Sequence, residues 1–189
     1  MQEDIARAAE VMRSGGVVLY PTDTVWGLGC DASCEEAVRK IFEIKRRADS
    51  KALISLVGSE RALVDCVGEE YAAIYSRLRE QAGGRPLTVV FPHAEGLAGN
   101  LSAEDGSAGL RLTGELYSSA LCEMLGHPVV STSANISGEP APRFYGEVAD
   151  AIVEAADYVS LYRRDDETPS QPSKVVKILP TGETVTLRP

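Results

Sequence analysis

The sequence is short of clustered cysteines and of long hydrophobic runs, and each shortage excludes a class of protein. The four cysteines are scattered, and only Cys30 and Cys34 lie close together, with no histidine nearby. Zinc sites usually show two tight pairs, so we expect these thiols to be small buried residues in a reducing compartment. No apolar run approaches the ~20 residues of a membrane helix, and the first thirteen residues lack a signal-peptide core. We therefore expect a cytoplasmic protein without a membrane partner.

Positive charge is also scarce. The 189 residues include 19 Lys and Arg against 28 Asp and Glu, which gives a net charge of −9. A chain this acidic repels a nucleic-acid backbone as a whole and is a poor candidate for avid nonspecific binding. A phosphate ligand would therefore need a local cluster of cations.

Several catalytic motifs are missing from the sequence. It contains neither the G-x-x-x-x-G-K-[ST] phosphate loop nor the G-x-S-x-G elbow, and its two histidines, His93 and His127, make a Ser-His-Asp relay improbable. Residues 27–32 match a relaxed G-x-G-x-x-A dinucleotide fingerprint. Six residues separate that match from the preceding apolar run, which favours a tight turn that needs glycine over a nicotinamide site.

The remaining composition and periodicity predict one folded domain, 1–189. Hydrophobic residues make up 44% of the chain and charged residues 25%, as in soluble globular proteins. Apolar spacing and turn residues predict helices through 5–12, from 33 onwards, and over 60–67, 69–82, 115–125 and 145–156, with strands over 17–20, 53–57, 87–91, 109–112, 128–133, 158–162, 174–179 and 183–187. This order predicts an α/β (α+β) fold: an open twisted mixed sheet flanked by helices. Ligands of such sheets bind at loops that leave strand ends.

A basic segment follows the second predicted helix. Lys45, Arg46, Arg47 and Lys51 place four cations within seven residues. They could form a solvated turn that favours the helix dipole. If the backbone is extended, however, Lys45 and Arg47 project to one side and could clamp a triphosphate.

A polar segment ends the predicted strand 128–133. By the same period of two, Ser131, Ser133 and Asn135 would face one way and offer two hydroxyls and an amide to a ligand. A capped turn is the alternative explanation.

These segments, with two others, match a known family. The chain carries Pro-Thr-Asp-Thr-Val-Trp-Gly-Leu-Gly at 21–29, Lys45-x-Arg47-x-x-x-Lys51, Arg-Pro-Leu-Thr at 85–88 and Ser133-x-Asn135-x-Ser-Gly. In order and separation these resemble the YrdC-like threonylcarbamoyl-AMP synthases, from Gly15 to Arg188. The resemblance implies a YrdC-like fold with a large concave cleft. It also implies ATP with Mg²⁺, L-threonine and bicarbonate as reactants, and a product passed to the tRNA threonylcarbamoyl-transfer machinery.

The resemblance also assigns residues by position, with no metal ligand from the protein. The catalytic tetrad would be Lys45, Arg47, Ser133 and Asn135. L-threonine would meet Thr24, Arg111, Ser133 and Ser173, with Arg111 suited to the carboxylate. ATP would meet Arg47, Lys51, Ser107, Asn135, Arg143 and Arg188. We expect Lys45 and Arg47 to be exposed in the cleft.

The match has departures, and two alternatives stay open. Trp26 stands where tyrosine is usual, Ala52 replaces a common proline or glycine, Arg143 replaces a frequent threonine, and Lys174 and Lys177 interrupt the usual run around Ser173. One alternative is a YciO-like protein, a relative understood to lack the full tetrad. The other is a double-stranded-RNA-binding YrdC-like module, for which the net charge allows only weak binding.

Overall fold

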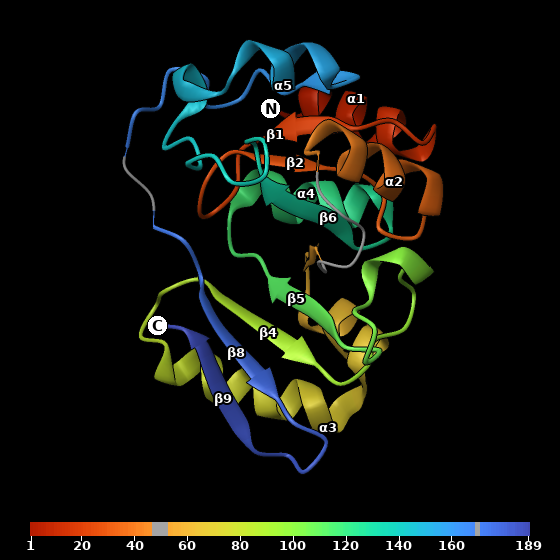
Figure 1. Ribbon diagram of the computed structural model, residues 1–189, viewed down its shortest axis with the longest axis vertical. Helices are drawn as coiled ribbons and strands as arrows, with labels where there is room; N and C mark the ends of the chain where they lie inside the picture. Colours follow the sequence, from red (N-terminus) through yellow and green to blue (C-terminus); the bar gives the residue numbers. More distant parts are fainter. Residues whose placement is uncertain (47–52, 169–170) are drawn as a thin grey trace.

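The structure, a computed structural model, describes residues 1–46, 53–168 and 171–189. Across these ranges the strands form a nine-stranded sheet in the order β7-β1-β2-β6-β3-β5-β4-β8-β9 (Figure 1). The strands are β1 (Val18–Tyr20), β2 (Gly27–Gly29), β3 (Ile54–Val57), β4 (Leu87–Phe91), β5 (Ala108–Leu112), β6 (Val129–Ser133), β7 (Tyr158–Val159), β8 (Lys174–Ile178) and β9 (Thr184–Arg188). The α-helices are α1 (Gln2–Arg13), α2 (Glu35–Ile44), α3 (Glu60–Gln81), α4 (Leu116–Leu125) and α5 (Asp150–Ala155), and short 3-10 helices cover Gly99–Leu101 and Tyr145–Glu147.

The sheet is mixed, as predicted. The pairs β1–β7, β3–β5 and β4–β8 are parallel, and the other neighbouring pairs are antiparallel. The closing antiparallel pair β8–β9 is also confirmed. Because β8 and β9 come from the end of the chain and join β4, the C-terminal segment completes the sheet.

Alternation along β1 explains how helices cover both faces of its half of the sheet. Val17 and Leu19 pack into the cluster of α2 and α5, whereas Val18 and Tyr20 pack into the cluster of α1 and α4. Successive strand side chains point to opposite faces, so an unbroken apolar run is buried on both sides.

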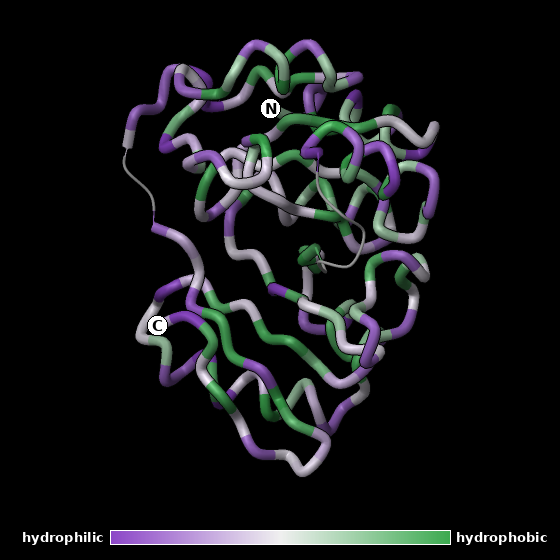
Figure 2. Tube along the Cα trace, in the orientation of Figure 1, coloured by the Kyte–Doolittle hydropathy of each residue, from purple (hydrophilic) through white to green (hydrophobic). Residues whose placement is uncertain are grey.

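The other half of the sheet has α3 on one face. Leu110 and Leu112 of β5 pack with α3 residues and with β4 and β8, and in Figure 1 α3 runs below these strands. Strands β4 and β8 are coloured largely hydrophobic in Figure 2. Because strand side chains alternate, Arg111 between the two leucines must point to the face opposite α3.

The predicted boundaries of several helices were wrong. Helix α2 is capped by Cys34 rather than Ser33, because the Ser33 hydroxyl donates to Asp31 instead. The predicted helix 145–156 is a 3-10 turn followed by the short α5. The predicted break between 60–67 and 69–82 is confirmed as a kink at Gly68, which has φ 80°.

Two strand-level predictions also changed. Residues 27–29 form β2 rather than a tight turn, and their φ values are not positive. Strand β7 covers only two residues of the predicted 158–162. The cysteine prediction largely holds, because all four thiols are free and only Cys34 is partly exposed.

Candidate active site

A cavity of about 300 Å³ opens on the face of the sheet opposite α3. Its walls come from β2, β3, β5, β6, β8 and β9, so segments far apart in sequence meet there. The polar residues that line it include Thr24, Arg111, Ser131, Ser133, Ser173 and Arg188. Five of these six were assigned to substrates from the family resemblance, Ser131 being the exception.

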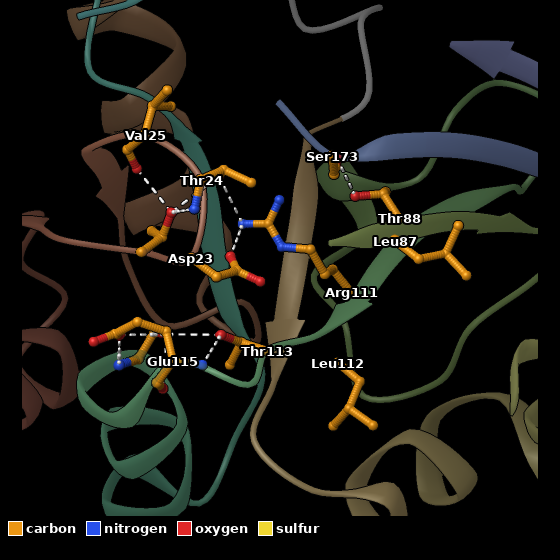
Figure 3. Close-up of polar contacts among 12 residues, drawn as sticks. Asp23, Thr24, Val25, Leu87, Thr88, Arg111, Leu112, Thr113, Glu115 and Ser173 are labelled. Carbon is orange, nitrogen blue, oxygen red and sulfur yellow. Dashed lines mark hydrogen bonds and ion pairs between the residues drawn. The ribbon is translucent and has the colours of Figure 1, made fainter. Parts of the chain in front are cut away.

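Arg111 is the most deeply buried charge in the wall. Its side chain is 3% exposed, and its Nη2 lies 3.0 Å from Asp23 Oδ1 and donates to Thr24 Oγ1 at 3.3 Å. Figure 3 shows the guanidinium reaching from β5 toward the loop that carries both partners. In the described part of the chain, Arg111 Nε has no hydrogen-bond partner. A buried donor of this kind is costly to leave unsatisfied, which favours an anionic ligand at this point.

The loop between β1 and β2 is fixed by the side chain of Thr22. Its hydroxyl donates to the Val25 carbonyl at 2.7 Å and accepts from the Thr24 backbone N–H at 3.0 Å. This short-range turn is a common use of threonine. It presents Asp23 and Thr24 to Arg111.

Lys45 links the end of α2 to the turn after β6. Its Nζ donates to the carbonyl oxygens of Ser133, at 2.5 Å, and Asn135, at 2.7 Å, and its own carbonyl accepts from Ser137 N. The end of α2 and the turn after β6, which both carry residues of the assigned tetrad, are therefore in contact. The expected exposure of Lys45 is wrong, since the residue is 2% exposed. The extended backbone that was the condition for a clamp by Lys45 and Arg47 is not found at Lys45, which has helical φ and ψ as the C-cap of α2.

Ser133 and Asn135 differ in their surroundings. Ser133 lines the cavity together with Ser131 and Thr132. The Asn135 amide turns to the backbone, with Nδ2 donating to the carbonyls of Ile136 and Glu139. Its Oδ1 is buried and has no hydrogen-bond partner within the described ranges.

Ser173 is held from two sides at the start of β8. Its hydroxyl lies 2.8 Å from that of Thr88 on β4, and it accepts from Arg188 Nη2 at 3.1 Å. Arg188 also donates through Nε to the Ser173 carbonyl. Burial, together with the nearby Arg111 and Arg85, lowers the pKa of the Arg188 guanidinium. Arg111 and Arg188 thus place two guanidinium groups in the lining of one cavity, in a chain of net charge −9.

Four described residues of the assigned set do not line this cavity: Lys45, Asn135, Ser107 and Arg143. Two more lie outside the described residues. Ser107 is buried and donates to Asp105 Oδ1 at 2.5 Å. Arg143 is exposed and forms an ion pair with Glu147. Arg47 and Lys51 fall in the undescribed range 47–52.

Asp23 and Thr88 had no predicted role, although Asp23 contacts Arg111 and Thr88 contacts Ser173. Both lay inside the segments that carried the resemblance, at 21–29 and 85–88. Their position in these segments was the only indication in the sequence that they could belong to the site. Their contacts with Arg111 and Ser173 became visible only in the three-dimensional structure.

The side chains that line the cavity do not fit a metal ion held by the protein. They are chiefly guanidinium and hydroxyl groups, whereas Mg²⁺ prefers carboxylate and phosphate oxygens. No group of three His, Cys, Asp or Glu side chains in the described ranges could hold a metal. A search of the same residues also finds no helix long and apolar enough to cross a membrane.

Fold and cavity together define an α/β protein with a concave, positively charged small-molecule site. The chain belongs to the Sua5/YciO/YrdC family, whose sequence model, described as "Telomere recombination", matches residues 10–189. It is 37% identical over 136 residues to a threonylcarbamoyl-AMP synthase of Methylococcus capsulatus, covering 72% of this chain and 73% of that one. It is 36% identical over 159 residues to the enzyme of the same name from Xanthomonas euvesicatoria, covering 82% and 84%.

A solved structure supports the same assignment. The crystal structure of P. abyssi Sua5 complexed with L-threonine superimposes with a TM-score of 0.83 at 29% identity. The match covers 100% of this chain and 54% of that one, so this chain spans about half the length of that relative.

Proposed function

We propose that this protein is an L-threonylcarbamoyladenylate synthase, a nucleotidyltransferase that joins L-threonine, bicarbonate and ATP. The observation that carries the proposal is Arg111, a buried guanidinium that lines the cavity with an unsatisfied Nε. A guanidinium fork suits a carboxylate. The family membership and the names of the relatives at 36% and 37% identity indicate that this carboxylate belongs to threonine.

The cavity offers a threonine side and a nucleotide side. The hydroxyls of Thr24, Ser133 and Ser173 belong to residues that line the same cavity as Arg111, and they would bind the amino and hydroxyl groups of the amino acid. Arg188, with Arg47 and Lys51 beyond the described residues, would bind phosphate. Asn135 would act through its unpaired Oδ1. We retain Ser107 and Arg143 as nucleotide contacts by resemblance, although neither lines the cavity.

The chemistry needs no protein nucleophile. The threonine amine adds to bicarbonate and loses water to give a carbamate. A carbamate oxygen then attacks the α-phosphorus of ATP, the bond to the β-phosphate oxygen breaks, and pyrophosphate leaves. The protein positions the two substrates and stabilises developing negative charge with its buried cations. A cavity closed to water would also protect the carbamate.

Mg²⁺ would enter with ATP. Because the cavity lining offers cations and hydroxyls instead of carboxylates, we propose that the ion is bound by the phosphates and water. We further propose that residues 1–189 act as one cytoplasmic domain whose product serves tRNA modification.

Pyrophosphate release from ATP tests the function directly. The purified chain with ATP, Mg²⁺ and bicarbonate should release pyrophosphate when L-threonine is added, and far less with serine, valine or carbamoyl phosphate. Release without preference for threonine would favour a YciO-like protein with another acceptor. Binding of double-stranded RNA with no release would favour the RNA-binding alternative.

Arg111→Gln sharpens the test. Losing two charge-assisted hydrogen bonds should raise the KM for threonine by about 100-fold while the KM for ATP changes little. Arg61→Gln is the matched control, because Arg61 forms an exposed ion pair with Asp65 on α3. An unchanged KM for threonine in Arg111→Gln would remove Arg111 from the site.

A further inference from the structure

Asp23 has no part in the chemistry above, yet it is the ion-pair partner of Arg111. The two side chains are 16% and 3% exposed, and their closest atoms are 3.0 Å apart. Burial raises the pKa of the Asp23 carboxyl, while the Arg111 charge acts in the opposite direction. A well-packed apolar pair often stabilises a fold as well as a buried ion pair does. Stability alone therefore does not explain why a carboxylate is buried at this position.

Asp23 reaches Arg111 from a loop that is already rigid. The Thr22 hydroxyl closes that loop with bonds to the Val25 carbonyl and to the Thr24 N–H. The backbone that carries the carboxylate is therefore held in place independently of any substrate. A charged partner on a rigid loop can hold a long side chain in one rotamer.

The donors of Arg111 divide into two groups. A guanidinium has five N–H donors. Its Nη2 forms an ion pair with Asp23 Oδ1, which has no hydrogen-bond partner in the described residues, and donates a hydrogen bond to Thr24 Oγ1. Its Nε has no partner among the residues that the structure describes, although it is buried, and Arg111 lines the cavity. Figure 3 shows the engaged nitrogen on the side of the Asp23 loop, and Ser173 on the other side of Arg111.

We propose that Asp23 is a positioning residue: it holds Arg111 by Nη2 so that the remaining N–H groups meet the carboxylate of the amino acid substrate. This inference rests on the proposed function and deepens it. Asp23 itself does not touch the substrate. Its effect on threonine is transmitted through Arg111, and without Arg111 it has none.

A double-mutant cycle on threonine KM separates this role from direct contact. The variants are Asp23→Asn, Arg111→Gln and the double variant, each assayed by pyrophosphate release with threonine and ATP varied separately. Asp23→Asn keeps the shape but loses the charge, so we expect a threonine KM about tenfold higher and an unchanged ATP KM. In the Arg111→Gln background the same change should alter threonine KM by less than about twofold, because interacting residues are not additive.

The control cycle uses Asp65→Asn and Arg61→Gln, the exposed pair on α3. These variants should leave both KM values unchanged. Should Asp23→Asn not fold, Asp23→Glu replaces it in the cycle, because one extra methylene displaces Arg111 while keeping the charge. Thermal unfolding of each variant identifies those that are folded.

The outcomes are distinct. Additive effects in the double variant would mean that Asp23 acts on the substrate independently, and a wild-type threonine KM in folded Asp23→Asn would mean that it does not act at all. Either result overturns the positioning role while leaving the synthase function intact. A wild-type protein that releases no pyrophosphate with threonine would overturn the proposed function and this inference with it.

Discussion

The ammonium of Lys45 donates to the carbonyl oxygen of Asn135 at 2.7 Å, and so fastens the end of α2 to the turn after β6. A second bond, to the Ser133 carbonyl, makes the link two-pronged. Three residues of the assigned tetrad are thus in direct contact before any substrate binds. Lys45 shapes the turn that presents Ser133 to the cavity, whatever charge it also supplies.

Lys45→Met should therefore lose both stability and activity. Hydrogen bonds to a charged group contribute ~1.5–3 kcal/mol each, and methionine would lose both part-buried bonds, so we expect at least about 2 kcal/mol less free energy of unfolding in urea. Synthesis should fall about 100-fold or more. Lys40→Met is the control, because Lys40 makes a similar bond to the Gly15 carbonyl at the surface. A Lys45→Met protein of wild-type stability would contradict the structural part of this role.

Thr88→Val should loosen Ser173 without unfolding the protein. Thr88 is fully buried, and its hydroxyl lies 2.8 Å from that of Ser173. Valine keeps the shape, but Ser173 then depends on Arg188 alone for orientation. We expect a threonine KM about three- to tenfold higher, measured by pyrophosphate release, with about 1 kcal/mol less stability. Thr186→Val on exposed β9 should change neither quantity.

Gly29→Ala should disrupt the sheet beside the cavity. An added Cβ would overlap the Val130 carbonyl oxygen and lie 2.7 Å from Tyr20 Cε1, and backbone atoms in a sheet cannot move aside cheaply. We expect a loss of several kcal/mol, on the order of 3, in urea unfolding, together with lost synthesis. In Gly114→Ala the added Cβ meets no atom within 4 Å, so that variant should behave as wild type.

This glycine shows where sequence reasoning reached its limit. Apolar periodicity located most strands and helices, because burial on two faces leaves a clear record in β1 and β5. The glycines at 27 and 29 look like those of a turn. The reason for glycine at position 29 is different, because the β6 backbone passes too close to allow a side chain there. Such a close approach depends on strands distant in sequence, and local spacing cannot reveal it.

The sequence indicated several residues that lie together in the structure, but it did not indicate their geometry. Thr24, Arg111, Ser133, Ser173 and Arg188 were assigned by position, and all line one cavity. The burial of Lys45 was not foreseen, because a lysine after a helix usually extends into solvent. Only the fold shows that the carbonyl groups of the turn after β6 lie next to the end of α2, where they accept hydrogen bonds from Lys45.

Acid should weaken the attachment of α1 to the C-terminal half of the chain. Asp4 on α1 is buried and accepts hydrogen bonds from Ser160 Oγ at 2.7 Å and from the Leu161 N–H at 3.0 Å. Burial raises the pKa of this carboxyl, but hydrogen bonds from Tyr158, Ser160 and the backbone outweigh it and leave the pKa below its usual value. Folding therefore favours the ionised form. The stabilisation is complete above the unfolded pKa of ~3.9 and is lost as the pH falls through the lower folded pKa.

Asp4→Asn tests this linkage. At neutral pH the variant should lose about 2 kcal/mol of unfolding free energy in urea, because bonds to a charged acceptor become bonds to an amide. As the pH falls below the unfolded pKa of ~3.9 the difference from wild type should shrink, since the wild-type carboxyl then becomes protonated as well. Glu3→Gln, at an exposed neighbour, is the control and should keep the wild-type pH profile. A destabilisation of Asp4→Asn that stays constant from neutral to acid pH would show that the Asp4 charge contributes nothing and that packing alone holds α1 to residues 158–162.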